Sequence, residues 1–358
     1  MAAPIAMLAE LTHRCPLSCP YCANPLELSR RDAELTADEW ARVFHEAADL
    51  GVLQLHLSGG EPASRRDLEA IAASARQAGL YVNLITSGVG LTLARLEALA
   101  GAGVDHVQLS VQGTTAASAD RVGGYKGGFD RKMAVAGHIT RLGLALTLNA
   151  VMHRHNLDEL PQVFDLAEAL GARRVEVACV QFQGWALRNR AVLQPTREQV
   201  DRAKALVAQA RAARSGRLVI DFVPPDYNAD LPKACMGGWG TTGLNVAPDG
   251  SVLPCHAAQT ITGLQFQSVR DTPLADIWYH GAAFQAFRGT AWMPAICQTC
   301  DRRDIDHGGC RCQAMAILGD ATAPDPVCRR TPGRAALDAA MAAEGNAPGL
   351  EAAVWRRM

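Results

Sequence analysis

The sequence predicts an α/β protein: a partial (β/α)6 TIM-like barrel, followed by a small cysteine-rich domain with a β-hairpin and helices. From residue 5 to about residue 182, six short apolar runs alternate with helical patterns. Small and polar residues recur where the runs end, and eleven cysteines gather mainly toward the two ends of the chain. Strands that alternate with helices form a parallel sheet with right-handed crossovers. Six such units are too few for a closed eight-stranded barrel, so an open barrel is expected.

The apolar runs are long enough for strands buried on both faces of a sheet. Thr36 is a candidate first cap of a helix, and Gly79 and Gly171 are candidate helix ends. The expected strands are 5–11, 53–57, 81–86, 106–111, 145–151 and 174–180, and the expected helices are about 36–50, 66–79, 92–101, 130–142 and 156–170.

Beyond the barrel, the pattern predicts a connector and then a hairpin. Pro248-Asp249-Gly250 between two short apolar runs is a strong hairpin signal. The other expected elements are a loop at 185–194, an amphipathic helix at 195–214, a strand at 218–223 and a helix at 274–288. The predicted domains are the barrel with its connector helix (1–215), the cysteine-rich domain (216–335) and a C-terminal tail (336–358), which is expected to be helical, then frayed, with no assigned function.

Composition predicts a globular, cytoplasmic protein. Of the 358 residues, 49% are hydrophobic and 20% are charged, and the formal net charge is −1. A net charge this close to zero gives no positive field that would attract nucleic acid or an anionic membrane. No signal peptide or membrane-length apolar run is evident. In a reducing compartment, clustered cysteines are more often metal ligands or catalytic thiols than disulfides.

Three cysteines, Cys15, Cys19 and Cys22, follow the first strand with Cx3Cx2C spacing. Each thiolate can bind one iron of a cluster, and three thiolates on a four-iron cluster leave one iron open to a ligand. Zinc usually takes four ligands, and only His13 is near, where we expect it to pack or form a hydrogen bond. The spacing therefore favours an iron–sulfur cluster over zinc, and Tyr21 before the last cysteine adds support.

Polar residues at later strand ends point to a binding site on the same rim. Ser58-Gly59-Gly60-Glu61-Pro62 follows the second strand, Ser87 the third and Gln112 the fourth, and Asn149 lies on the fifth. Paired glycines let a backbone approach a ligand closely. By itself the turn is equally well an ordinary start of a helix with proline in its first position.

Together these motifs resemble the radical S-adenosylmethionine enzymes over about residues 5–182. The resemblance implies a [4Fe–4S] cluster on the three cysteines, whose open iron binds S-adenosylmethionine and whose reduction yields a 5′-deoxyadenosyl radical. It implies that Glu61 and the backbone of Gly59 and Gly60 bind the methionyl amino group, with Tyr21 also at the cofactor. Ser87, Gln112 and Asn149 are suited to the methionine or the ribose, or else form ordinary turn and cap hydrogen bonds.

The second group of cysteines begins at Cys235, and Cys179, alone between the groups, is expected to be a buried apolar residue. Cys-x2-Cys followed by Cys-x-Cys can also be a zinc ribbon. The order of cysteines resembles the SPASM extension of these enzymes, which implies two auxiliary iron–sulfur clusters. The implied ligands are Cys235, Cys255, Cys310 and Cys312 for the nearer cluster, and Cys297, Cys300, Asp306 and Cys328 for the distal one. Asp306 stands where the family has cysteine, and His307 is a rival ligand.

Longer segments, such as 8–16, 56–62, 83–90, 106–113 and 309–314, resemble the PqqA peptide cyclases. The resemblance implies a bond between a glutamate γ-carbon and a tyrosine ring in the peptide PqqA, during biosynthesis of pyrroloquinoline quinone. One electron would leave by way of the auxiliary clusters. Few residues precede the first strand, so we expect a separate chaperone, PqqD, to present the peptide. An electron donor such as a flavodoxin or ferredoxin is also implied, and no catalytic base is predicted.

Two alternatives stay open. The first is another SPASM enzyme that acts on peptides, for example one that forms thioethers or matures sulfatases; Asp306 weighs against it. The second is an electron-transfer or zinc-binding module without catalysis. The open position of the first cysteine group and the Gly-Gly-Glu-Pro turn weigh against this module.

Overall fold

The computed structural model describes residues 2–342 and 348–357, and its framework is one curved sheet. The strand order is β7-β6-β5-β4-β3-β2-β1-β8-β9, and every neighbouring pair is parallel except β8 and β9. The strands are β1 (Ala6–Thr12), β2 (Gln54–Gly59), β3 (Tyr81–Thr86), β4 (His106–Val111), β5 (Ala145–Met152), β6 (Arg174–Cys179), β7 (Val219–Val223), β8 (Gly243–Val246) and β9 (Val252–Leu253). The sheet curls but does not close, which confirms the open barrel.

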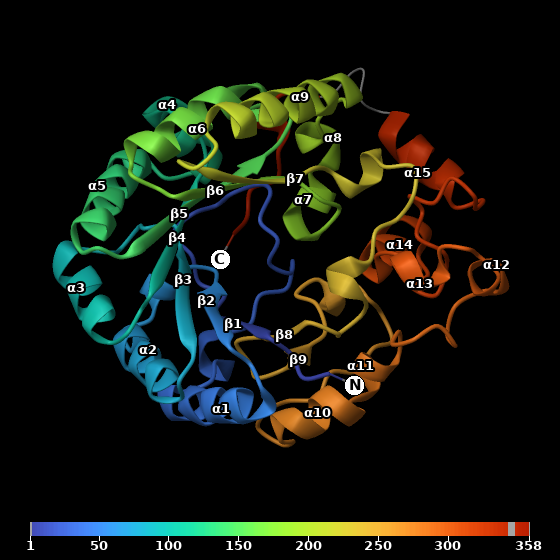
Figure 1. Cartoon of the computed structure of the whole chain (residues 1–358), viewed down its shortest axis with the longest axis horizontal. Helices are drawn as coiled ribbons and strands as arrows, with labels where there is room; N and C mark the ends of the chain where they lie inside the picture. The colour runs from blue at the N-terminus through green and yellow to red at the C-terminus, as the bar shows by residue number, and fades with distance from the viewer. Residues whose placement is uncertain (1, 343–347, 358) are drawn as a thin grey trace.

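Helices cover the outer side of this arc (Figure 1). They are α1 (Ala37–Leu50), α2 (Leu68–Gln77), α3 (Leu93–Gly101), α4 (Ala116–Gly123), α5 (Gly128–Arg141), α6 (Leu160–Ala169) and α9 (Arg197–Ala213). Thr36 caps α1 through a reciprocal pair of hydrogen bonds with Glu39, as its sequence predicts. Gly51 ends α1 in the left-handed conformation, at φ 109°.

The main core lies between the sheet and this layer of helices. On β4, Val107, Leu109 and Val111 are buried, whereas Gln108 and Ser110 alternate with them and are only half-buried. Side chains of a strand point to opposite faces in turn, so Val107 and Leu109 pack under the helices, whereas Gln108 and Ser110 face the inside of the arc. The interior of the arc is therefore available for a polar site.

The cysteine-rich domain is joined to the barrel through the sheet. The predicted hairpin forms as β8 and β9, and β8 pairs in parallel with β1 along Ala6 to Ala9. The same domain carries α10 (Leu274–His280), α11 (Ala282–Gln285), α12 (Ala295–Gln298), α13 (Arg303–Asp306) and α14 (Arg311–Leu318). No helix in the described ranges is both long and apolar enough to span a membrane.

Two local predictions were wrong. The expected loop at 185–194 forms two short helices, α7 (Gly184–Arg188) and α8 (Arg190–Leu193), because Trp185 and Leu193 are drawn into buried positions. A single helical turn leaves no periodic pattern to detect. The expected helix 274–288 is interrupted at Gly281, whose backbone is extended.

The C-terminal tail returns to the barrel. After α15 (Arg334–Met341), residues 348–357 run as a dark red segment into the interior of the arc, where the label C stands in Figure 1. Leu350 and Ala353 are buried against Val180 and Leu193. Residues 343–347, in the part expected to fray, lie outside the described residues.

Candidate radical S-adenosylmethionine site

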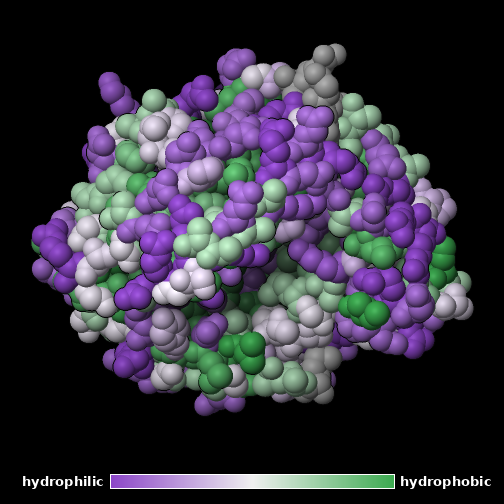
Figure 2. All heavy atoms as spheres, turned by 45° about the horizontal axis from the view of Figure 1, so that its top comes forward, coloured by the Kyte–Doolittle hydropathy of each residue, from purple (hydrophilic) through white to green (hydrophobic). Residues whose placement is uncertain are grey.

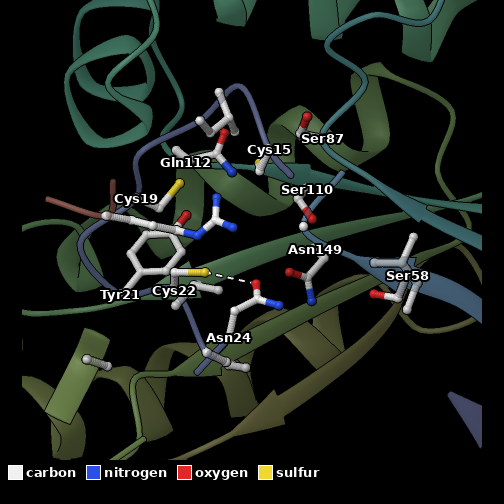
Figure 3. Close-up of a pocket in the computed structure, with 18 of the residues that line it drawn as sticks. Cys15, Cys19, Tyr21, Cys22, Asn24, Ser58, Ser87, Ser110, Gln112 and Asn149 are labelled. Carbon is white, nitrogen blue, oxygen red and sulfur yellow. Dashed lines mark hydrogen bonds between the residues drawn. The ribbon is translucent and has the colours of Figure 1, made fainter. Parts of the chain in front are cut away.

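A cavity of about 390 Å³ opens at the C-terminal ends of the barrel strands. A hollow is visible near the middle of the face in Figure 2, and Figure 3 shows one pocket from within. This is the edge where parallel α/β sheets bind ligands, and the volume suits a small-molecule cofactor. The cavity brings together most of the predicted residues, namely Cys15, Cys19, Tyr21, Cys22, Gly59, Gly60, Ser87, Gln112 and Asn149.

The three cysteines lie on one loop that begins where β1 ends. Their thiols are free, and the loop is held by the amide of Ser18, which donates to the carbonyl of Gly123 at 2.8 Å. The Cys22 thiol donates to Oδ1 of Asn24 at 3.0 Å (Figure 3). Burial raises the pKa of Cys15 to about 11 and that of Cys19 to about 12. These thiols therefore stay protonated without metal, and binding of a cluster would release their protons.

The three thiols border one shared space, as the ligands of a cluster do. Within residues 2–342 and 348–357, no three His, Cys, Asp or Glu side chains converge on one point as a mononuclear site requires. In an iron–sulfur cluster each thiolate binds its own iron, so the thiols stand apart around the cluster. Cys15, Cys19 and Cys22 border one cavity in this way.

Gly59 and Gly60 join the end of β2 to the cysteine loop. A Cβ on Gly60 would lie 2.4 Å from the carbonyl oxygen of Arg14, and a Cβ on Gly59 2.3 Å from that of Thr12. The Gly60 amide donates to the Thr12 carbonyl at 2.6 Å. The glycines are thus required by close backbone packing, and they also leave their backbone exposed on the cavity wall.

Glu61 differs from the other predicted cofactor residues because it is fully buried and does not line the cavity. Its carboxylate accepts hydrogen bonds from the hydroxyl of Thr86 at 2.6 Å and from the amide of Ser87 at 2.7 Å. It lies behind the wall that Gly60 and Ser87 form. The side chain therefore fixes the positions of groups that face the cavity.

Gln112, Asn149 and Tyr21 come from three different elements. Asn149 of β5 is the register partner of Ser110 on β4, and both line the cavity. Gln112 directly follows β4. The Tyr21 ring lies 5.8 Å from the ring of His153, and burial raises the pKa of its hydroxyl well above the usual value.

His13 and Cys179 both lie in buried positions. His13 accepts a hydrogen bond at Nδ1 from the Ser29 amide at 2.9 Å, which agrees with the expected hydrogen-bonding role. Cys179 is buried in the main core, as expected, but it also reaches the cavity wall at the end of β6.

Several residues of the cavity were not predicted from the sequence. His256 and Gln183 form a 2.8 Å hydrogen bond, and both border this cavity and the nearer cysteine cavity described below. The position of His256 directly after Cys255 was the one available signal. Arg356 also lines the cavity, from a tail that was expected to have no role. The ammonium of Lys132, buried nearby, donates to the carbonyl of Ser110 at 3.0 Å.

In the cysteine-rich domain, Cys235, Cys255, Cys310 and Cys312 border one cavity. Their thiols form a closed ring in which Cys255 contacts Cys235 and Cys312, and Cys310 contacts the same two residues. Hydrogen bonds from Cys235 and Cys312 hold the pKa of the Cys255 thiol well below its usual value. Four thiols around one cavity are enough to ligate one cluster.

Another cavity is bordered by Cys297, Cys300, Asp306 and Cys328, and His307 is not among its lining residues. Asp306 is buried; its carboxylate lies 3.2 Å from Nε of Arg302 and accepts from the Gly308 amide at 3.0 Å. Asp325 borders both cysteine cavities, and burial raises its pKa to about 6.

Family models and relatives agree with this geometry. Residues 9–167 match the Radical SAM superfamily, and residues 235–301 match an iron–sulfur cluster-binding domain termed SPASM. The chain is 64% identical over 344 residues to the PqqA peptide cyclase of Ruegeria pomeroyi, covering 95% of this chain and 92% of that protein. It is 61% identical to the PqqA peptide cyclase of Rhizobium meliloti, covering 92% and 88%.

Solved structures share the fold. The Streptococcus suis protein SuiB bound to S-adenosylmethionine superposes with a TM-score of 0.75 at 20% identity, over 92% of this chain and 78% of that one. The protein anSMEcpe, with bound AdoMet and a peptide, gives a TM-score of 0.68 at 14% identity, over 93% and 96%. With the high identity of its relatives, these matches establish that the chain belongs to the PqqA peptide cyclase family of radical S-adenosylmethionine enzymes with a SPASM domain.

Proposed function

We propose that this chain joins a glutamate and a tyrosine side chain of the peptide PqqA by a carbon–carbon bond, in the biosynthesis of pyrroloquinoline quinone. The observation that carries the proposal is the cavity where Cys15, Cys19 and Cys22 meet Gly59 and Gly60. Identity of 64% to a PqqA peptide cyclase supports the choice of substrate. Joining two carbons that each carried hydrogen removes two hydrogens from the peptide.

The proposed cofactor site uses residues of the cavity and the wall behind it. A [4Fe–4S] cluster on Cys15, Cys19 and Cys22, with S-adenosylmethionine, would supply a radical that abstracts hydrogen. The backbone of Gly59 and Gly60, with Glu61 behind it, is proposed to orient the methionyl amino group. The methionine and ribose are assigned to Tyr21, Ser87, Gln112 and Asn149.

The apolar part of the wall protects the reaction. The residues concerned lie at the ends of β4 to β6 and just beyond them, and they present apolar surface to the space in front of the cysteines. They are Val111, Val151, Ala178 and Val180. A peptide side chain in this space would meet the abstracting group without competition from solvent.

The remaining assignments are also proposals. Two auxiliary clusters are assigned, one to Cys235, Cys255, Cys310 and Cys312, and one to Cys297, Cys300, Asp306 and Cys328, within a domain of residues 216–335 that follows the barrel and connector at 1–215. The peptide is presented by the chaperone PqqD, and electrons come from a flavodoxin or ferredoxin in the cytoplasm.

The test is the mass of the peptide after a single incubation. Anaerobically reconstituted, reduced protein with S-adenosylmethionine, PqqA and PqqD should yield a peptide lighter by two hydrogens. Replacing either the glutamate or the tyrosine of the peptide should abolish that change. Cleavage of S-adenosylmethionine with an unchanged peptide mass would contradict the substrate assignment and favour another peptide.

Metal analysis tests the cofactor assignment separately. We expect about four irons at the first site, with further iron in the cysteine-rich domain. Cys15→Ala should lose the first-site iron, whereas Cys179→Ala, which removes a thiol outside the loop, should retain it. Zinc in place of iron in the reconstituted protein would overturn the assignment.

A further inference from the structure

The C-terminal tail is fastened directly to the cysteine loop. Nδ2 of Asn189 donates to the carbonyls of Pro20 and Val354, at 2.8 Å in each case. Oδ1 of Asn189 accepts from the amide of Val354 at 2.7 Å. One amide side chain therefore ties residue 354 of the tail to residue 20 of the loop that carries the cysteines.

Two residues farther along, Arg356 enters the cavity itself. It is 3% exposed, and its amide donates to the carbonyl of Ser18, between Cys15 and Cys19, at 3.3 Å. Its guanidinium donates to the carbonyl of His13. Cys15, Cys19 and Cys22 line the same cavity. The tail thus places a positively charged side chain in the cavity that the three thiols line.

This cation has no negative partner in the described chain. Among residues 2–342 and 348–357, no carboxylate lies within 4.0 Å of Arg356, and its buried Nε has no hydrogen-bond partner. A buried charge without a counter-charge is costly, so such a group usually faces an anion that completes the site.

The three thiols lie on the wall of the cavity that Arg356 enters. Its amide and its guanidinium donate to carbonyls on either side of Cys15, at Ser18 and His13, so the charge is held beside the thiol loop. Lys132, whose ammonium donates to the carbonyl of Ser110 at 3.0 Å, is a second buried cation near the cavity. Three thiolates around a four-iron core give a net negative charge, which increases on reduction.

We propose that Arg356 is the built-in counter-charge of the first cluster and that it raises the reduction potential of that cluster. The inference rests on the ligand assignment proposed above. A fixed cation beside the cluster favours the more negative, reduced state, and burial strengthens the interaction. Arg356 is a positioning residue that acts through the cluster, and the tail that carries it becomes part of the site.

The experiment is a redox titration of the full reconstituted chain, followed by electron paramagnetic resonance without S-adenosylmethionine. The first cluster is recognised as the one whose signal changes when S-adenosylmethionine is added afterwards. Arg356→Gln should shift its midpoint potential to more negative values, and Arg356→Lys should shift it less. The matched control is Arg357→Gln, which removes the same charge from the neighbouring, exposed residue and should leave the midpoint unchanged.

An Arg356→Gln protein with full iron content and an unchanged midpoint would overturn the proposal. So would an equal shift in Arg357→Gln. If Arg356→Gln does not retain the cluster, the neutral variant Arg356→Met is titrated in its place, and an unshifted midpoint there counts against the proposal. Failure of the ligand assignment gives a different result, since Cys15→Ala would then keep its first-site iron.

Discussion

The carboxylate of Glu61, at the end of the turn after β2, holds Ser87 at the end of β3 by two hydrogen bonds, 2.7 Å from its amide and 2.5 Å from its hydroxyl. Two neighbouring strand ends are thereby fixed relative to one another. The amide of Glu61 also ties the same turn to the start of the cysteine loop, because it donates to the carbonyl of Arg14 at 2.7 Å. The three parts of the proposed cofactor site are therefore one hydrogen-bonded unit.

Glu61→Gln should weaken this unit. The NH2 group of the glutamine cannot accept the hydrogen bond that the replaced oxygen of Glu61 accepts. Loss of a buried hydrogen bond to a charged group costs about 2 kcal/mol. We expect the free energy of unfolding of the metal-free chain to fall by about that amount, as measured with denaturant. The exposed Glu97→Gln is the control. Equal stability of the two variants would contradict a bracing role for Glu61.

Cys312→Ser should reduce the iron content of the cysteine-rich domain. Cys312 closes the ring of four thiols with Cys255 and Cys310, and a hydroxyl is a poorer ligand for a cluster than a thiolate. Iron analysis after reconstitution measures the loss, and the first-site signal should persist. Cys179→Ser controls for removal of a buried thiol. Full iron content in Cys312→Ser would exclude Cys312 as a ligand.

Asp306→Cys should change the spectrum of the distal cluster. Asp306 borders the cavity of Cys297, Cys300 and Cys328, so a thiolate there would replace a harder oxygen ligand. Electron paramagnetic resonance of the reduced protein would report the change. His307→Ala should leave the same signal intact, because His307 does not line that cavity. An unaltered spectrum in Asp306→Cys would remove Asp306 from the ligand set.

His153 should make the chain less stable as pH falls. Burial lowers its pKa from 6.5 to about 3, so the folded imidazole stays neutral where the unfolded chain already binds a proton. Between about pH 6.5 and pH 3 this group should reduce the free energy of unfolding by about 1.4 kcal/mol per pH unit. Denaturant unfolding of metal-free His153→Gln should show a shallower slope. The exposed His45→Gln is the control, and identical slopes in the two variants would argue against the assignment.

Local patterns in the sequence predicted the barrel and the residues on its rim that line the proposed cofactor site. Strand and helix periods depend on nearest neighbours along the chain, and strand ends of a parallel sheet must meet at one edge. Cys15, Gly60, Ser87 and Asn149 could therefore be placed on one rim from the order of strands and helices alone. The two short helices at 184–193 could not be predicted, because a helix of a single turn is too short to show a periodic pattern of apolar residues.

The sequence alone predicted the residues of the proposed sites: the three cysteines, the Gly-Gly-Glu-Pro turn and the second cysteine group. Only the tertiary structure decided that Glu61 lies behind the wall rather than on it, that Cys312 borders the same cavity as Cys235, Cys255 and Cys310, and that Arg356 enters the cavity of the first three cysteines. The physical reason is distance along the chain. More than three hundred residues separate Arg356 from Cys22, and no local pattern encodes a contact that forms only when the tail packs into the barrel.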